Sequence, residues 1–588
     1  YRDYLIRAFN DDVPYPQFVK EAIAGDLLPK PRLKNGLNES AIGIAQLRMV
    51  LHGFSPVDSL DEMVTFTDNQ IDTVTKAFQS LTVSCARCHN HKFDAISQAD
   101  FYSLYGIFTS THPAVIDVNA PGTGKAEREE LARLKQQIKD AVAAHWLKVA
   151  PKTVSYDTSD SAHPGLDKYQ WFTNGVSRTK AGEFSIALEG TGIVSQIYPG
   201  GYFSNLLTTK ERAVVFSNRF KCEGGTLWFR VAGNGGVKAK YVVENYPRTG
   251  TIHKAVILSE PRDEKLGWRS LDLEFWKGDE IFLQLITSAD MPAEYNKDAR
   301  SWFGLTDVVI TKDKNPPTAE VRTQLSAGEV IQAWQKGTLS NSQAEALNRL
   351  VQAGLLPNQL KDIPEAAKLV TRYREVEAKL PMPTRVPGVI EADAKDAPLF
   401  VRGDHKQPSD IVPHRFLDAL DPTPFNTKGS GRLQLAEHMA SAQRVEKETG
   451  IKASFTLGQA AHESGWGKRE IRNADGSDSH NLFGIKADSR WRGETLILQT
   501  KEFIRGQWVV VPAKWRKYAS WQESIDDHAA FLKQNPRYLP CFQCLKAEAF
   551  AQALAKAGYA TDPGYADKVI NLMNQHKLQA DRKSTRLN

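Results

Sequence analysis

The spacing of apolar residues changes repeatedly along the 588-residue chain, which excludes one repeating architecture. Between residues 150 and 315, short runs such as 226–231 and 280–286 alternate apolar and polar side chains, with Gly- and Asp/Asn-rich turns between them. This pattern predicts the antiparallel strands of a β-sandwich or jelly roll. The regions on either side have helical spacing. We therefore predict a multidomain α+β protein with a helical N-terminal region, a central β-sandwich and a mainly α-helical C-terminal domain that contains a β-hairpin, formed by 495–504 and 508–518.

These changes of pattern set the expected segment boundaries. The expected segments are a helical region at 1–115, a long helix at 116–149, the β-sandwich at 150–315, a helical segment at 316–380, a Pro-rich segment at 381–441, a C-terminal domain at 442–580 and a tail at 581–588. The prolines predict a linker or an extended wrapping segment. The tail is similar to a translated sequencing adaptor. Because the chain starts at Tyr1 without a signal-peptide pattern, we expect a fragment that has lost any export signal.

Positive charge is concentrated at the C-terminal end. Residues 442–588 carry 23 Lys and Arg against 16 Asp and Glu, whereas the whole chain has a net charge of +6. A basic module suits an anionic polymer such as cell wall, nucleic acid or a membrane surface, and an ordinary solvated surface is the alternative. No apolar run reaches the roughly 18 residues that a membrane span needs, so we expect no transmembrane segment.

One carboxylate in this basic module has the surroundings of a catalytic acid. The segment Gln459–Gly467 ends an apolar helix with Glu463 and then places Trp466 between two glycines. Cleavage of a glycosidic bond needs a carboxyl group that stays protonated near neutral pH, and apolar burial raises a carboxyl pKa. Glu463 is therefore a candidate general acid, with a solvated glutamate at a helix end as the alternative. Glu502, in the predicted hairpin, is a candidate second carboxylate, and the aromatic residues nearby either stack on sugar rings or pack in the core.

Four motifs in one order strengthen this interpretation: Ala461–Gly467, Asn481–Lys486, Asn535–Tyr538 and Ala557–Ala566. Together they closely resemble the glucosaminidase domains of flagellar-type peptidoglycan hydrolases, glycoside hydrolase family 73. The resemblance implies a lysozyme-like fold and an endo-β-N-acetylglucosaminidase that cuts peptidoglycan glycan strands in the periplasm or outside the cell. It implies the flagellar rod as a further partner and no nucleic acid. It implies no cofactor and no metal for this domain, and it gives Cys541 and Cys544 no role.

The same resemblance assigns residues. The family's catalytic acid corresponds to Glu463, its second carboxylate to Glu502 and an important tyrosine to Tyr559, with Tyr565 as the alternative. The implied substrate-binding residues are Trp466, Asn481, Phe483, Tyr538 and Tyr565. Two routes stay open for the second step: Glu502 acts as a base, or the substrate's own acetamido group attacks the anomeric carbon.

A second chemical motif lies near the N-terminus. Cys85, Cys88 and His89 have the CxxCH spacing that attaches c-type haem through two thioether bonds, with the histidine as an axial ligand. From spacing alone, a zinc or structural role is the alternative. Leu81–Phe108 is similar to secreted cytochrome-c-like proteins of planctomycetes (DUF1549), and Val401–Asp404 with Gly429–Glu437 is similar to a later domain of that family (DUF1553). This resemblance implies covalently attached haem c and a carbohydrate-binding β-sandwich.

The two resemblances meet near Ser441, where one pattern stops within a domain and the other begins. Because these families are not normally joined, we predict a chimera of two genes. We assign function to the C-terminal domain, as a hydrolase of the β-1,4 glycosidic bonds of peptidoglycan. The alternative function is a secreted c-type cytochrome for electron transfer, or a carbohydrate-binding protein, to which the hydrolase domain is fused by an assembly error.

Overall fold

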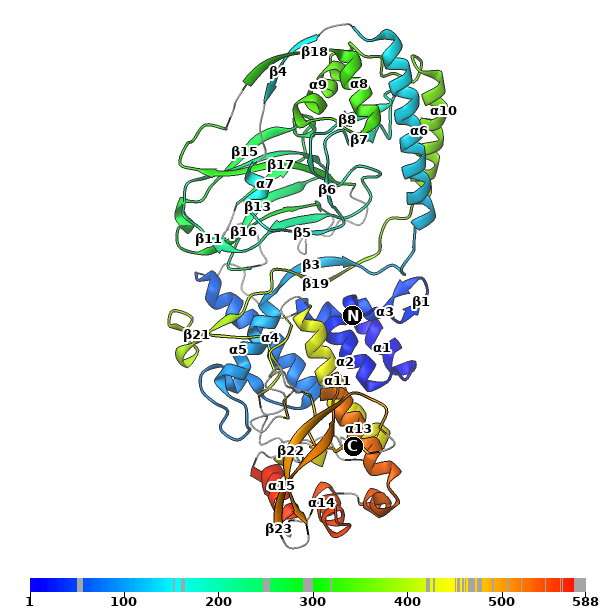
Figure 1. Cartoon of the computed structure of the whole chain (residues 1–588). Helices are drawn as coiled ribbons and strands as arrows, with labels where there is room; N and C mark the ends of the chain where they lie inside the picture. The colour runs from blue at the N-terminus through cyan, green and yellow to red at the C-terminus, as the bar shows by residue number, and fades with distance from the viewer. Residues whose placement is uncertain are drawn as a thin grey trace.

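A β-rich body, a helical N-terminal body and a C-terminal body follow one another in the computed structural model (Figure 1). The structure describes the chain except for residues 50–56, 152–153, 160–163, 247–253, 289–299, 318–319, 419–422, 427–428, 450, 452–454, 457–458, 460–461, 464–470, 473–478, 489–490, 505–506, 520, 545, 561, 563 and 576–588. The predicted tail at 581–588 lies outside the described residues. The predicted class, a multidomain protein of mixed helices and strands, is confirmed.

Short helices build the N-terminal body. Its elements are α1 (Arg2–Asn10), α2 (Tyr15–Ala24), β1 (Leu33–Lys34), β2 (Leu37–Asn38), α3 (Glu39–Ile42), α4 (Ser59–Gln79), the 3-10 helix η3 (Val83–Arg87), α5 (Gln98–Thr109) and β3 (Thr111–Asp117). Asp58 accepts hydrogen bonds from two backbone N–H groups at the start of α4, and Ser97 forms a capping box with Asp100 at the start of α5. Every residue of α5 from Asp100 onward is buried, so this helix lies at the centre of the body.

Two antiparallel sheets form the β-rich body. They comprise β5 (Trp171–Asn174), β6 (Arg178–Thr179), β9 (Gly201–Phe203), β10 (Val214–Ser217), β11 (Phe220–Lys221), β12 (Thr226–Asn234), β13 (Val237–Val243), β14 (Ala255–Leu258), β15 (Gly267–Asp272), β16 (Glu280–Ile286) and β17 (Trp302–Thr311). One sheet has the order β14-β13-β16-β10-β5, with β11 beside β16, and the other has the order β15-β12-β17-β9-β6. An apolar core that includes Phe229, Leu283 and Phe303 contains residues from both sheets.

Helices from both sides of the sandwich sequence form one layer beside it (Figure 1). They are α6 (Lys125–Val149), α8 (Ala327–Lys336), α9 (Asn341–Gln352) and α10 (Pro364–Lys379), accompanied by the short strands β7 (Phe184–Ile186), β8 (Val194–Ile197), β4 (Val154–Ser159) and β18 (Glu320–Leu325) and the helix α7 (Pro164–Asp167). Trp146 of α6 stacks on Trp334 of α8 with ring centroids 5.2 Å apart, and both rings are fully buried. Stacking of this kind joins segments that are nearly 190 residues apart in the sequence.

The Pro-rich segment returns to the N-terminal body and does not act as a free linker. Its strands are β19 (Arg385–Glu391), β20 (Ala397–Phe400) and β21 (Pro408–Val412). β19 pairs with β3 from Arg385–Asp117 to Glu391–Thr111, and Phe400, Phe416 and Phe425 are buried in the N-terminal core. Proline suits such edge strands because it supplies no N–H donor.

The helix α11 (Gly431–Thr449) connects the N-terminal body to the C-terminal body. At its start Arg432 is fully buried and binds Asp26 and Glu391. The C-terminal body then contains β22 (Thr495–Ile504), β23 (Gln507–Arg516), α13 (Trp521–Gln534), the 3-10 helix η8 (Pro536–Gln543), α14 (Ala547–Lys556) and α15 (Tyr565–Gln575). None of the helices in the described part of the chain combines the length and apolar character that crossing a membrane requires.

Candidate active site

Glu463 occupies a partly buried position in helical backbone of the C-terminal body. Burial raises the pKa of its carboxyl group above the ordinary value for glutamate, and a hydrogen bond with Tyr565 opposes part of this rise. A carboxyl group with a raised pKa retains its proton at a pH where a solvated glutamate is ionised. The side chain predicted to be the general acid therefore has the electrostatic property that this role needs.

The hydroxyl group of Tyr565 is held in place next to this carboxyl group. Tyr565 begins α15 and is almost fully buried, and Gln459 Nε2 donates a hydrogen bond of 2.7 Å to its hydroxyl oxygen. Its ring lies 5.4 Å from that of His462 and 5.7 Å from that of Tyr559. Burial, followed by the charges of Tyr559 and Glu463, raises the pKa of Tyr565. Tyr565 is therefore a neutral hydrogen-bond partner of Glu463.

Tyr559 continues this group of aromatic side chains into the interior. Its ring centroid lies 5.8 Å from that of Tyr538, and its hydroxyl oxygen lies 3.2 Å from His528 Nε2. Burial and then the charge of Glu463 raise the pKa of Tyr559 well above its ordinary value. Burial also lowers the pKa of His528 to about 3, so this imidazole is neutral and is the hydrogen-bond partner of a neutral phenol.

Two residues predicted to bind substrate make internal contacts. Asn481 Nδ2 donates to the carbonyl oxygens of Ile485 and Arg516, both at 2.9 Å, and its Oδ1 accepts from Ile485 N–H. Phe483 is 4% exposed and stacks on the ring of His528 at a centroid distance of 3.9 Å. Tyr538 is 2% exposed and packs against Phe531. These contacts hold the loop, the hairpin and α13 together, and the roles of these three residues toward substrate stay predictions.

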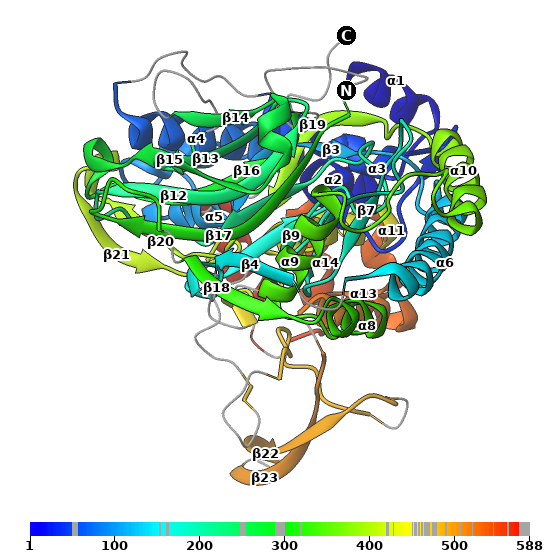
Figure 2. The ribbon, with the colours of Figure 1, turned by 90° about the horizontal axis from the view of Figure 1, so that it is seen from above.

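The hairpin formed by β22 and β23 carries the predicted second carboxylate. Its strands pair in one continuous register from Thr495–Arg516 to Ile504–Gln507, with Glu502 opposite Val509. Figure 2 shows the hairpin extending away from the rest of the molecule. The structure describes the backbone of Glu502 but not its side chain, and Trp466 lies outside the described residues. The structure therefore leaves the roles of both residues untested.

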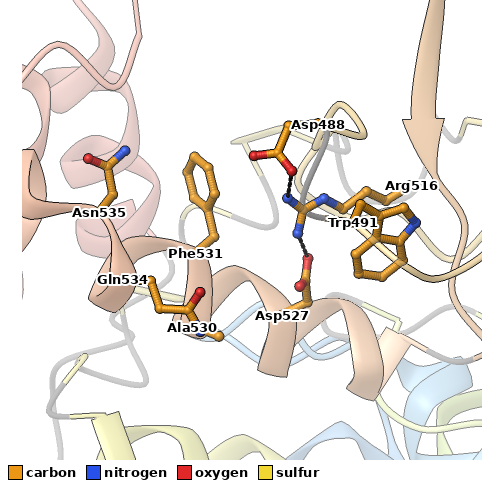
Figure 3. A pocket seen from close by; sticks show the side chains of 8 residues that line it. All are labelled: Asp488, Trp491, Arg516, Asp527, Ala530, Phe531, Gln534 and Asn535. Atoms are coloured by element: carbon orange, nitrogen blue, oxygen red, sulfur yellow. Dashed lines mark hydrogen bonds and ion pairs between the residues drawn. The ribbon is translucent and has the colours of Figure 1, made fainter.

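A pocket of about 120 Å³ lies where the hairpin meets α13 (Figure 3). It is lined by Asp488, Trp491, Arg516, Asp527, Ala530, Phe531, Gln534 and Asn535. The Arg516 guanidinium lies between two carboxylates, with Nη1 2.6 Å from Asp527 and Nη2 3.7 Å from Asp488. Its charge is therefore compensated by residues from two different elements.

The sequence did not single out the partners of the predicted site residues. Gln459 holds Tyr565, His528 contacts Tyr559, and Arg516 joins the hairpin to α13. Gln459 lies within the predicted catalytic motif, so the sequence indicated its place near Glu463 but not its hydrogen bond with Tyr565. His528 and Asp527 occupy the polar half of an otherwise ordinary amphipathic pattern, which gives no signal of a contact with a distant residue.

At the N-terminus, Cys85 and Cys88 are exposed free thiols that flank the end of η3. His89 is exposed, and its Nδ1 lies 2.8 Å from the carbonyl oxygen of Asn90. Donation from Nδ1 to a carbonyl leaves the Nε2 lone pair for an axial ligand bond, as metal-binding histidines require. The two thiols and the imidazole therefore fit the donor set of a covalently attached haem. In the part of the chain that the structure describes, no three His, Cys, Asp or Glu side chains gather into a metal site.

The C-terminal part of the chain is similar to glycoside hydrolase domains. Residues 439–578 match the Glucosaminidase family model, described as mannosyl-glycoprotein endo-β-N-acetylglucosaminidase. Residues 1–113 match a second family model, described as a protein of unknown function, DUF1549. The predicted resemblances to the glucosaminidase domain and to DUF1549 are therefore confirmed, whereas the likeness of residues 401–404 and 429–437 to DUF1553 stays a prediction. Residues 114–438 lie between the two matches.

More particularly, this domain is similar to the peptidoglycan hydrolase FlgJ. FlgJ of Escherichia coli (strain K12) is 40% identical over 173 residues, which cover 29% of this chain and 53% of that protein. The exo-glucosaminidase LytG of Bacillus subtilis (strain 168) is 33% identical over 142 residues, which cover 23% of this chain and 48% of that protein. A C-terminally truncated glycoside hydrolase domain of Salmonella typhimurium FlgJ is a solved structure with 40% identity and a TM-score of 0.21, covering 24% of this chain and 91% of that one. The chain thus spans about half the length of the curated FlgJ proteins it matches in E. coli. These relatives support a peptidoglycan hydrolase rather than the cytochrome alternative.

Proposed function

We propose that the C-terminal domain hydrolyses the β-1,4 glycosidic bonds of peptidoglycan glycan strands, as an endo-β-N-acetylglucosaminidase with a lysozyme-like fold. The observation that carries this proposal is the partly buried carboxyl group of Glu463, whose pKa is raised and which forms a hydrogen bond with Tyr565. Such a group protonates the leaving glycosidic oxygen. The matched family and the FlgJ relatives support the substrate class.

The test of the proton donor is Glu463→Gln, which keeps the shape of the side chain but removes its proton. Removal of a general acid costs about 10²–10⁴-fold in rate, so we expect cell-wall clearing in a gel to be lost. The matched control is Glu494→Gln in the same domain, because Glu494 is 74% exposed and forms an ion pair with Lys517 at the surface. Clearing by Glu463→Gln, in protein that melts like wild type, would remove Glu463 from this role. Mass analysis of the products tests the bond, since a glucosaminidase leaves N-acetylglucosamine at the new reducing end.

For the second step, we place Glu502 as the carboxylate that activates water or stabilises the sugar cation. Its position in β22 and the FlgJ-like motif order support this assignment. We expect Glu502→Gln to lower turnover at least about 100-fold if the carboxylate acts on the sugar. Turnover within a few fold of wild type would instead assign the attack to the acetamido group of the substrate.

The site of action and the further partner follow from the same likeness. We place the enzyme in the periplasm or outside the cell, where its substrate lies. We propose the flagellar rod as its partner because the chain is similar to FlgJ and its motifs resemble those of flagellar-type hydrolases. Co-sedimentation of the purified chain with isolated flagellar basal bodies tests the partner. Equal sedimentation of the chain without basal bodies would contradict it.

For the N-terminal body, we propose that Cys85 and Cys88 attach a haem and that His89 ligates its iron. The exposed thiols and the Nδ1 contact of His89 with a backbone carbonyl support this assignment. When bound, the haem supplies one-electron transfer. Expression with a c-type maturation system should give a pyridine haemochrome spectrum that Cys85→Ala with Cys88→Ala abolishes. Absence of the spectrum in the native chain would reject the proposal.

A further inference from the structure

We propose that Arg516 is a positioning residue that fixes the β22–β23 hairpin, and with it Glu502, relative to Glu463. This inference rests on the proposed function, because it assigns Arg516 a part in the same reaction. It starts from the way the hairpin is attached to the domain.

Apart from the contacts at its base, the hairpin makes few contacts that could fix its orientation. In the described part of the chain, β22 and β23 form a two-stranded sheet whose one additional bridge, from Trp515 to Lys486, lies at the base of the hairpin, and residues such as Ile497 are exposed. A two-stranded hairpin of this kind has marginal stability without further packing. The direction in which it points therefore depends on the contacts at its base.

Arg516 makes these basal contacts with both its backbone and its side chain. Its N–H donates to the carbonyl oxygen of Ile485 at 3.0 Å, and its own carbonyl oxygen accepts from Asn481 at 2.9 Å. Its guanidinium binds Asp527 on α13 and lies over the ring of Trp491 at 4.7 Å. The side chain is only 8% exposed, so water screens these interactions weakly.

The carboxylate of Asp527 is itself fixed by a second residue of the hairpin base. The hydroxyl of Tyr518, two residues beyond Arg516, donates to Asp527 Oδ2 at 2.7 Å. The ring of Tyr518 contacts Trp491 edge to face at 5.3 Å. Arg516, Tyr518, Trp491 and Asp527 thus form one cluster, here called the basal clamp, which joins the end of β23 to α13. Figure 3 shows Arg516, Trp491 and Asp527 of this cluster.

The length of the hairpin amplifies any change at this clamp. Thr495 is the partner of Arg516, and Glu502 lies seven residues further along β22. At about 3.3 Å per residue this separation is roughly 23 Å, so a tilt of about 10° at the base moves Glu502 by roughly 4 Å. A displacement of about 1 Å is enough to lower catalysis up to 100-fold. Loss of the clamp therefore removes the defined placement of Glu502.

The guanidinium geometry explains why lysine does not replace Arg516. Nη1 and Nη2 reach carboxylates of two separate elements, while the planar group stacks on an indole ring. A lysine ammonium keeps the charge but loses the planar fork and the stacking. The buried Nε of Arg516 has no hydrogen-bond partner among the described residues, so the orientation of the guanidinium depends on Nη1 and Nη2.

The decisive experiment is a double-mutant cycle of Arg516→Lys and Glu502→Gln on cell-wall digestion. We expect Arg516→Lys to lower kcat about tenfold or more with little change in KM, and to lower it less than about twofold further when Glu502 is already replaced. The matched control is Lys517→Ala, which breaks the exposed pair with Glu494 at the same base and should stay within about twofold of wild type. Losses that multiply in the double variant, or an unchanged kcat in Arg516→Lys, would overturn the inference.

Two further measurements keep the test decisive. If Arg516→Lys does not fold, Asp488→Asn replaces it, because Asp488 is 38% exposed and its contact with Arg516, at 3.7 Å, is the longer of the two carboxylate contacts of the guanidinium. The distance between nitroxide labels introduced as unnatural amino acids at Ile497 and Lys556 should broaden in the clamp variant and not in Lys517→Ala. An unchanged distance distribution would contradict the inference without reference to activity. Failure of the wild-type chain to digest cell wall would instead reject the proposed function.

Discussion

The carboxyl group of Glu463 and the hydroxyl group of Tyr565 form the smallest unit on which the proposed chemistry depends. Burial raises the pKa of Glu463, and the hydrogen bond with Tyr565 acts in the opposite direction. Gln459 fixes the hydroxyl group by donating to its oxygen. The proton of the acid is therefore balanced between desolvation, which retains it, and one hydrogen bond, which favours its release.

This balance gives a prediction for Tyr565→Phe. Without the hydrogen bond that stabilises the carboxylate, the pKa of Glu463 rises further. Because the general acid acts in its protonated form, the fall of kcat/KM with rising pH should move to higher pH. A pH profile of wall digestion measures this. Tyr538→Phe is the matched control, since its hydroxyl contacts Arg537 and not Glu463. A falling limb that stays in place or moves to lower pH in Tyr565→Phe would contradict the assignment.

At this scale the sequence predicted Glu463 as the general acid, a role that stays a prediction, but it did not predict the contacts around Glu463. Glu463 was identified because a motif of nine residues places it at the end of an apolar helix. Its partner Tyr565 was one of two alternatives, and Gln459 lies 106 residues from the tyrosine that it binds. Such contacts depend on how helices pack, and no local spacing encodes them.

Among the elements, α13 links the most parts of the C-terminal body. Its residue Asp527 contacts the hairpin, and His528, the next residue along, stacks on Phe483 and contacts Tyr559. Burial lowers the pKa of His528 to about 3, whereas the ordinary value is 6.5. The folded domain thus excludes a proton that the unfolded chain binds below pH 6.5.

The sign of this effect fixes the expected dependence of stability on pH. The unfolded state binds more protons between pH 6.5 and about 3, so stability is complete above pH 6.5 and is lost as the pH falls. The free energy of unfolding that is lost because of His528 approaches about 1.4 kcal/mol per pH unit. Urea unfolding at pH 7 and pH 5 measures it, and His528→Gln should show a smaller difference between the two values. An equal difference in both proteins would contradict the assignment.

The Pro-rich segment contains strand pairing that the sequence did not predict. Its prolines predicted a linker or a wrapping segment, and the structure has a segment whose strand β19 pairs with β3, about 270 residues earlier. The alternating strands of the sandwich were predictable because each has its own period, as in β12 and β16. The pairing of β19 with the distant strand β3 was not predictable, because proline content describes only the local backbone.

For the whole molecule, the buried side chain of Arg432 determines how the parts are joined. It is fully buried at the start of α11, where it contacts Asp26 at 2.9 Å and Glu391 at 2.6 Å. These two carboxylates come from the first and the last parts of the N-terminal body. One cation therefore closes this body and anchors the helix that leads into the hydrolase domain.

Arg432→Leu should destabilise the N-terminal body by up to about 3–5 kcal/mol, because the partly buried carboxylates of Asp26 and Glu391 lose a fully buried cation. Thermal unfolding measures the change. The matched control is Arg133→Leu on the surface of α6, where Arg133 is 56% exposed and pairs with Glu130, so the expected change is at most about 1 kcal/mol. Equal effects of the two substitutions would show that Arg432 is not an anchor.

Because α11 begins in the N-terminal body and ends in the C-terminal body, this helix fixes the rotation of one body relative to the other around the helix axis. The helix advances 100° and 1.5 Å with each residue. One residue added in the middle of α11 would therefore rotate the whole hydrolase domain by about 100° around the helix axis, whereas seven residues would restore nearly the original direction at a distance about 10 Å greater. The mutual orientation of the C-terminal and N-terminal bodies is thus set by the number of residues in a single helix.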